Sequence, residues 1–444
     1  MRLNLKKTKK QSIPDSQKFT SDFNSVIYII LWNSLGFFFI EFIMSYLIKQ
    51  VLKAPAAQLG LFFSFITLGG LISSSFVGYL ADHFSKKNLV MIGAFGRGIS
   101  YFGLYIAIIL QSIPGMYISA FLLGIGAHLF WIPLDTIISE KSSKYHRSSA
   151  FGKRRFAMGI GLVFGTVVGF TVFGVANSVV PGNDFILYGI IPVYGIANFY
   201  AGIRFSRKVN EQRIFTYPDE DNTQDLLIDQ ENKISSTNST TVSESTSRFY
   251  LFGIILLFSG LLLNAINFGF YRPFIQPFVL ENINSNAGLV AWFYLPTAVI
   301  GTLIAPKLGT LADRINPYLG ISIAAFLGGI VTLLIINTTN LWFFAFLLII
   351  DNTIMLTVGF VFINFLSRVS VKHRGKIFSL VTAFESLGMI IGPILGGFVW
   401  DTISQQAPFI ISVIVEWSLI SFFIIGIWIL SPLLVENIEN RKDK

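Results

Sequence analysis

The chain of 444 residues contains no cysteine, and only 13% of its residues are charged. The absence of cysteine excludes disulfide bonds and thiolate metal sites. Soluble domains carry roughly 25% charged residues, so this chain has too little polar surface to cover a soluble fold of its size. It also lacks the Gly-x-x-x-x-Gly-Lys-Ser/Thr loop that binds ATP, and its four histidines are scattered along the sequence. We therefore expect no enzymatic activity, no cofactor and no metal site.

Apolar residues are what the chain has in abundance. They make up 53% of the sequence and gather in blocks long enough to cross a bilayer, which takes about 20 residues per helix. We therefore predict an all-α membrane protein with twelve transmembrane helices. The apolar blocks lie near residues 26–48, 57–80, 88–110, 115–139, 156–178, 184–206, 249–272, 287–306, 318–337, 341–366, 377–400 and 408–434.

The net charge of +9 is distributed in a way that indicates membrane orientation rather than nucleic-acid binding. With the N-terminus in the cytoplasm, all but four of the 33 lysines and arginines fall in the tails and loops on the cytoplasmic side. The exceptions are Lys49, Lys53, Arg97 and Arg272. Because cytoplasmic loops are enriched in Lys and Arg, we predict that both termini are cytoplasmic. We expect a monomer in the plasma membrane, with the first span acting as its export signal.

One short phrase occurs twice. Gly78-Tyr-Leu-Ala-Asp82 returns 231 residues later as Gly309-Thr-Leu-Ala-Asp313. A polar, Ser/Thr-rich segment between them cannot bury enough apolar surface to order itself, so we predict a flexible cytoplasmic linker. This divides the chain into an N-terminal six-helix bundle, the linker and a C-terminal six-helix bundle, at residues 1–206, 207–247 and 248–444. Parallel repeats of this kind are typical of two pseudo-symmetric bundles that rock around a central cavity.

The repeated phrase resembles the loop signature of the major facilitator superfamily, Gly-x-Leu-x-Asp-Arg-x-Gly-Arg-Lys. Here the first Arg is His83 and the second Gly is Ser85, and the later copy is weaker after Arg314. The resemblance covers nearly the whole chain and implies that Asp82 contacts a neighbouring helix start when the cytoplasmic side closes. The predicted gate residues are Gly78, Asp82, Lys86, Lys87, Gly309, Asp313 and Arg314.

A glycine stripe in the eleventh span resembles the Gly-Pro motif of the same superfamily. Gly388, Gly392 and Gly396 recur every four residues and therefore share one helix face, with Pro393 beside them. Small residues at this spacing let helix backbones approach closely in a membrane. We predict a helix-packing role, and a role in bending is the alternative.

Polar residues inside membrane spans are costly and mark the transport pathway by default. Helix spacing places Asn33 and Glu41 on one face of the first span, His128 and Asp135 on one face of the fourth, and Asn264 and Asn267 on one face of the seventh. The alternative for each face is a buried polar network that joins helices. The predicted pathway residues are Asn33, Glu41, Arg97, His128, Asp135, Arg155, Asn264, Asn267, Arg272, Asp351, Asn352 and Glu385.

The fourth and fifth spans show a finer resemblance, to the oligosaccharide and nucleoside proton-symporter branch. It rests on the segments Pro133-Leu-Asp135, Glu140-Lys141 and Phe151-Gly-Lys-Arg-Arg155. The resemblance implies that Asp135 and Arg155 together grip sugar hydroxyls. We interpret Lys153 and Arg154 as loop cations of the positive-inside pattern. The alternative is a charge pair at the cytoplasmic end. The branch's tryptophan on the fifth span is Leu162 here, and its proton site is not preserved.

The repeat also places Glu41 opposite Arg272, because these residues are 231 positions apart. We expect them to form an ion pair that shuts the outer gate in the inward-facing state. The alternative is that Glu41 binds substrate or a proton while Arg272 lies among lipid headgroups.

The sequence therefore predicts a secondary transporter of a small organic solute, working by alternating access. Our first interpretation is proton-coupled symport of a sugar- or nucleoside-like substrate. A multidrug/proton antiporter of the same superfamily is the second. A non-transporting membrane receptor or scaffold is the third.

Overall fold

The computed structural model describes residues 18–143, 147–180, 182–215, 244–312, 315–369 and 374–430. Across these residues the chain is helical, and its one β-type pairing is an isolated bridge between Phe19 and Ser142. Eleven helices are long and apolar enough to cross a membrane, and a shorter apolar stretch at Ala287–Gly301 supplies a twelfth. The prediction of an all-α membrane protein is thus confirmed.

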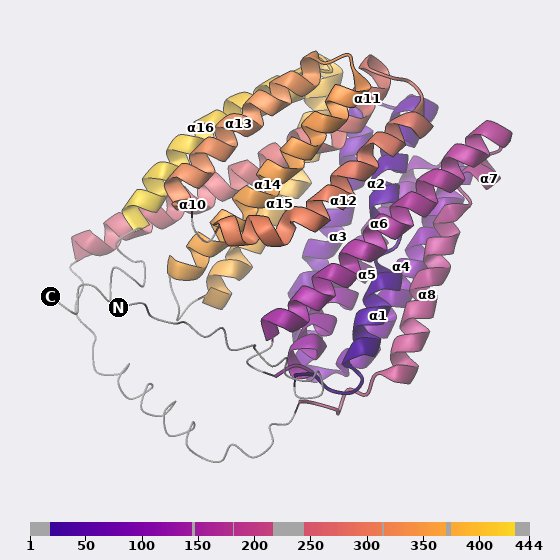
Figure 1. Cartoon of the computed structure of the whole chain (residues 1–444), viewed down its shortest axis with the longest axis horizontal. Coiled ribbons are helices and arrows are strands. Elements are labelled where there is room, and N and C mark those ends of the chain that lie inside the picture. Colours follow the sequence, from indigo (N-terminus) through magenta and orange to yellow (C-terminus); the bar gives the residue numbers. More distant parts are fainter. Residues whose placement is uncertain are drawn as a thin grey trace, which may run out of the picture.

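The first half of the chain forms one group of helices (Figure 1). Its first span is divided into three pieces and its sixth into two. The elements are α1 (Phe23–Asn33), α2 (Phe37–Tyr46), the π-helical turn η2 (Leu47–Val51), α3 (Ala56–His83), α4 (Lys86–Ile109), α5 (Ile113–Glu140), α6 (Arg147–Val179), α7 (Asp184–Leu187) and α8 (Ile190–Lys208).

The second half repeats this plan. Its first span is also divided, at a 3₁₀ turn in the place that corresponds to the later part of α2. The elements are α10 (Glu244–Tyr271), η4 (Arg272–Phe274), α11 (Ile275–Asn282), α12 (Ala287–Ala312), α13 (Pro317–Asn337), α14 (Leu341–Val369), α15 (Arg374–Thr402) and α16 (Ala407–Leu430).

The two halves meet through two equivalent helix pairs. Helix α3 packs on α15, and α6 packs on α12. By the 231-residue repeat, the second span is equivalent to the eighth, and the fifth is equivalent to the eleventh. The contact between the second and eleventh spans is therefore equivalent to the contact between the eighth and fifth, and the pseudo-twofold axis relates the two. The predicted pair of pseudo-symmetric bundles is therefore present.

Contacts between the halves concentrate at the end where α3 begins. Gln50 donates a hydrogen bond to Glu281 over 3.2 Å, and these residues are themselves 231 positions apart. Asp401 accepts from the backbone N–H groups of Ala56 and Ala57 at 2.8 and 2.9 Å, which caps the start of α3. Figure 1 shows the two groups spreading apart toward the opposite end, where α8 and α14 finish.

The first span is broken where we expected a continuous helix. Gly36 has a φ of +86°, a left-handed conformation that favours glycine, and it separates α1 from α2. A side chain at Gly36 would collide with the Tyr194 ring, and a side chain at Gly165 would collide with the Gly36 backbone. The break therefore lets α6 and α8 pack closely against the first span.

The glycine stripe on α15 packs against α10. A side chain at Gly388 would collide with Ala265, one at Gly392 with the carbonyl of Ile266, and one at Gly396 with the carbonyl of Phe270. These positions allow backbone-to-backbone contact, in line with the predicted packing role.

A hydrogen-bonded cluster joins three segments at the open end of the first bundle. Lys141 is almost fully buried and pairs with Asp22 at 2.8 Å. Lys141 also donates to the carbonyls of Asn210 and Arg213, and the Asn210 N–H donates to Asp22. The first residues of the predicted linker are thus held on the bundle, whereas residues 216–243 lie outside the described part of the chain.

Candidate functional site

A cavity of about 830 Å³ lies between the two halves. Helices α2, α3, α5 and α6 line it from the first half, and α10, η4, α12, α14 and α15 line it from the second. Pockets of roughly 300–1,000 Å³ are usual for drug-sized ligands. The cavity's size and its position between the bundles make it the candidate functional site.

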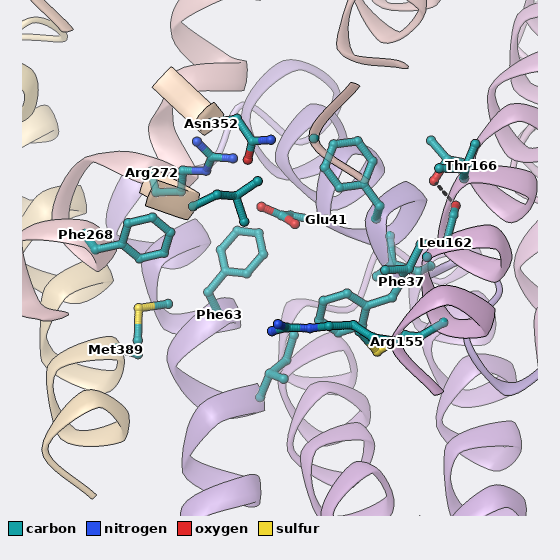
Figure 2. A pocket seen from close by; sticks show the side chains of 18 of the residues that line it. Phe37, Glu41, Phe63, Arg155, Leu162, Thr166, Phe268, Arg272, Asn352 and Met389 are labelled. Atoms are coloured by element: carbon teal, nitrogen blue, oxygen red, sulfur yellow. Dashed lines mark hydrogen bonds between the residues drawn. The ribbon is translucent and has the colours of Figure 1, made fainter. Parts of the chain in front are cut away.

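The lining is mostly apolar and rich in aromatic rings. Phe63, Phe268 and Met389 approach the cavity from three different helices (Figure 2). The polar side chains are few, and they are Glu41, Thr67, Arg155, Thr166, Arg272 and Asn352. Three of these donate to backbone carbonyls: Thr67 to Phe63 at 3.3 Å, Thr166 to Leu162 at 2.6 Å and Asn352 to Thr297 at 3.4 Å.

Arg272 pairs with Asp351 rather than with Glu41. Its guanidinium donates to an Asp351 carboxylate oxygen at 3.1 Å. Glu41 interacts electrostatically with Arg272 and points toward it in Figure 2, but the two form no ion pair in the described part of the chain. The expected Glu41–Arg272 pair is therefore wrong for this conformation, because a carboxylate on α14 lies closer to the guanidinium.

Arg155 reaches the cavity from the start of α6. Its side chain is exposed, and Figure 2 shows the guanidinium pointing toward the centre of the pocket. It forms no ion pair with any described residue, so its charge is available to a solute.

The structure separates Asp135 from Arg155. Asp135 pairs instead with Arg154 at 2.5 Å, and that guanidinium also stacks over the Trp131 ring with 4.6 Å to the centroid. Neither partner is among the residues that line the cavity. The expected Asp135–Arg155 grip is thus wrong, and Arg154 is a pairing residue rather than a loop cation, because the two neighbouring arginines point in different directions from α6.

Asn33 and Arg97 belong to a buried network inside the first bundle. Asn33 donates to Asn198 at 2.7 Å and accepts a short hydrogen bond from Arg97. The break at Gly36 lies between Asn33 and Glu41, so the two do not share a cavity-facing surface. The helix-joining alternative applies here.

Four further predicted residues also lie away from the cavity lining. His128 contacts Gly70 and its ring nitrogen lies 3.2 Å from the Gly124 carbonyl. Asn267 is buried within α10, whereas Asn264 and Glu385 are exposed. Of the predicted pathway residues, Glu41, Arg155, Arg272 and Asn352 line the cavity, and Asp351 adjoins it through its pairing with Arg272.

The predicted gate loop is held by a residue that the sequence did not point to. Glu211 accepts hydrogen bonds from the Ser85 hydroxyl and the Lys86 N–H, at 2.5 and 2.7 Å, at the start of α4. Lys86 also pairs with Glu140 at 2.8 Å. Asp82, Gly78 and Lys87 remain near the end of α3 and the start of α4, where Asp82 is exposed. Gly309 lies in α12, whereas Asp313 and Arg314 lie outside the described residues.

The aromatic lining was missed because it has no sequence signal of its own. Phe63, Phe268 and Phe360 line the cavity, yet in sequence they resemble the many phenylalanines that face lipid. The 231-residue offset between the halves could have pointed to some of them, because it makes the residues near Glu41 equivalent to the residues near Arg272.

Curated proteins with similar sequences are transporters. An uncharacterized MFS-type transporter, YqjV of Bacillus subtilis, is 22% identical over 385 residues, or 83% of each chain. The human MFS-type transporter SLC18B1 is 30% identical over 183 residues, or 37% of this chain and 39% of the relative. A tetracycline resistance protein, class H, of Pasteurella multocida is 31% identical over 169 residues, or 36% of this chain and 40% of the relative.

Solved structures share the fold. A bacterial homolog of the human lysosomal transporter Spinster, in an inward-facing conformation, has a TM-score of 0.65 at 13% identity and covers 94% of this chain and 97% of its own. Tetrameric PepTSo2 has a TM-score of 0.68 at 14% identity, and the match covers 93% of this chain and 97% of the PepTSo2 chain. A family profile described as Major Facilitator Superfamily matches residues 26–370 and 257–442. The chain therefore belongs to the major facilitator superfamily of membrane transporters.

Proposed function

We propose that the protein is a secondary transporter that carries amphipathic organic solutes across the membrane by alternating access. The observation that carries this proposal is the cavity between the halves, which is large, mostly apolar and aromatic, and furnished with a few charged groups. Such a lining favours a solute with apolar rings and one or two polar groups.

The conformation supports alternating access. The hydrogen bonds that join two described residues of different halves lie where α3 begins or within its first third, from Gln50 to Ser64. The opposite end carries the linker, which the distribution of Lys and Arg assigns to the cytoplasm. In this orientation the structure corresponds to an inward-facing state.

Three observations favour amphipathic solutes over the sugars and nucleosides of our first interpretation. A sugar site needs several hydrogen-bonding groups, and leaving a hydroxyl unpaired in an apolar cavity is costly. The polar lining here is sparse, and the Asp135–Arg155 arrangement of the symporter branch is absent. In addition, one similar protein from Lactococcus lactis is named a multidrug resistance efflux pump, PmrA homolog.

Glu41 is the candidate coupling group. It is the one carboxylate among the described lining residues, since Asp351 is held by Arg272 behind them. A carboxylate that takes either a proton or a substrate cation exchanges the two, and this exchange is the basis of antiport.

The test is transport by purified protein in liposomes. We expect a dansyl-labelled amphiphile such as dansylcadaverine to accumulate in vesicles with an acidic lumen faster than in protein-free vesicles, which measure passive trapping of the amine, and radiolabelled lactose and uridine not to accumulate. Accumulation with an alkaline lumen would indicate symport instead. Flux of the sugars alone would contradict the proposed solute class, and the absence of any flux would favour the receptor alternative.

Glu41→Gln should reduce accumulation driven by the pH gradient at least tenfold, because it removes the exchangeable proton. Glu385→Gln is the matched control, since Glu385 lies outside the cavity lining. An unchanged gradient dependence in Glu41→Gln would contradict coupling at this residue.

A further inference from the structure

We propose that the cavity selects zwitterionic amphiphiles, with the solute's cationic group placed on Glu41 and its anionic group on Arg155. This inference rests on the proposed function, because it specifies the solute of the same cavity. It is carried by two opposite charges that face one apolar space and form no ion pair with any described residue.

The first of these charges is the carboxylate of Glu41. Among the described residues its side chain makes no hydrogen bond and no ion pair, and only its backbone carbonyl accepts, from the Ser45 hydroxyl. It projects from α2 into the space next to Phe63 and Phe268 (Figure 2). A carboxylate among aromatic rings has little solvation and therefore gains strongly from a cation brought by the solute.

The second charge is the guanidinium of Arg155, which lines the same cavity from α6. It extends from α6 over the same space and is likewise free of ion pairs within the described chain. Its neighbour Arg154 is committed to Asp135 and Trp131, so Arg155 alone presents a cation from this part of α6. The planar guanidinium donates in a fork that matches a carboxylate or phosphate.

Arg272 does not duplicate Arg155. Its charge is matched by Asp351 at 3.1 Å, and the two carboxylates of Glu41 and Asp351 share this one guanidinium. The group of Glu41, Arg272 and Asp351 therefore has a formal charge of −1, and Arg155 supplies +1 elsewhere in the same lining. A zwitterion neutralises both poles, whereas a singly charged solute leaves one pole desolvated without a partner.

The experiment measures binding of four probes that share one fluorophore and differ in charge. They are Nε-dansyl-lysine, which is zwitterionic, dansylcadaverine, which is cationic, dansyl-6-aminohexanoate, which is anionic, and N-hexyl dansylamide, which is neutral. Binding to the purified full-length protein is followed by dansyl fluorescence. We expect the zwitterion to bind at least tenfold more tightly than the neutral probe and more tightly than either singly charged probe.

The variants test the assignment of each pole. Glu41→Gln should weaken binding of the zwitterionic and cationic probes about tenfold and leave binding of the anionic probe unchanged. Arg155→Gln should weaken binding of the zwitterionic and anionic probes and leave binding of the cationic probe unchanged. Glu385→Gln and Arg207→Gln, which change charge outside the cavity lining, should leave all four affinities unchanged. Thermal unfolding of each variant shows whether it is folded.

Equal binding of the four probes, or equal weakening of all four by either variant, would overturn the charge selectivity while leaving amphipathic transport intact. A complete absence of binding and flux for every probe contradicts both proposals. A purely structural role of Glu41 and Arg155 predicts equal weakening, so the opposite selectivities of the two variants are the decisive result.

Discussion

At the level of single residues, the ion pairs among the described residues differ in how deeply they are buried. Asp22 and Lys141 are paired and almost fully buried, with exposed side-chain fractions of 6% and 1%. Lys86 and Glu140 are paired but partly exposed, at 23% and 29%. Since breaking a buried pair leaves an uncompensated charge, the two pairs should differ strongly in their contribution to stability.

Lys141→Met tests this difference. We expect it to lower the free energy of unfolding by about 3–5 kcal/mol, because it leaves the Asp22 carboxylate buried without its partner. Lys86→Met is the matched control and should cost about 1 kcal/mol or less. Thermal unfolding in detergent, followed by tryptophan fluorescence, measures both; similar losses in the two variants would contradict the structure of this cluster.

The Asp22 pair also predicts a pH dependence of stability. Burial by itself would raise the pKa of Asp22, but hydrogen bonds from Lys141, Asn210 and Thr20 lower it below its usual value. A carboxylate with a lowered pKa stabilises the fold above its unfolded-state pKa of about 3.9, and this stabilisation is lost as the pH falls through the folded-state pKa. Wild type should therefore exceed Asp22→Asn in stability at pH 7, and the difference should shrink below about pH 4. A constant difference would contradict a charged Asp22.

At the level of helices, glycine decides which surfaces come together. The stripe on α15 contacts backbone atoms of α10. On α6, Gly161 and Gly165 do the same against the first span, whereas Gly169 faces the side chains of Tyr194 and Phe39. Spacing along the sequence predicted the stripe on α15 and its packing role. It did not predict the break at Gly36, because a lone glycine in an apolar run is compatible with a continuous helix. The left-handed conformation of Gly36 depends on its packing against Tyr194 and α6, which are distant in sequence.

Gly396→Ala measures the packing of α15 on α10. An added methyl group would collide with the carbonyl of Phe270, so the helices must separate and the unfolding temperature should fall by several degrees. Gly174→Ala on α6 is the control, since nothing lies near the added methyl group, and alanine is favoured over glycine in a helix by roughly 1 kcal/mol. Equal effects of the two substitutions would show that close approach at Gly396 is unimportant.

At the level of the whole molecule, the two halves spread apart at the end where α3 finishes, and Asp82 is exposed there (Figure 1). The family resemblance implies that this carboxylate contacts a helix start of the other half when that end closes. Glu211, by contrast, already caps α4 within the first bundle and should be indifferent to closure. The two acidic residues near the same loop therefore have separable roles.

Asp82→Asn should weaken closure of the linker side. The natural absence of cysteine allows a single Phe156→Cys in the cavity lining to report access. In inverted vesicles, an impermeant maleimide should label this position severalfold faster when Asp82 is replaced, whereas Asp184→Asn, at the far end of the bundle, should leave the rate unchanged. Unchanged labelling in Asp82→Asn together with normal transport would rule out a gating role.

The sequence by itself determined the class of molecule, the twofold plan and the candidate charged residues, because long apolar blocks, loop cations and a repeated phrase can be read directly from the order of residues. It placed Glu41, Arg155, Arg272 and Asn352 among the candidates, and the structure brings all four to one cavity. The tertiary structure alone decided the partners: Asp351 for Arg272, Arg154 for Asp135 and Asn33 for Arg97. Ion pairs and hydrogen bonds in an apolar interior depend on distances of a few ångströms between side chains on different helices. The spacing of residues along one helix carries no information about those distances.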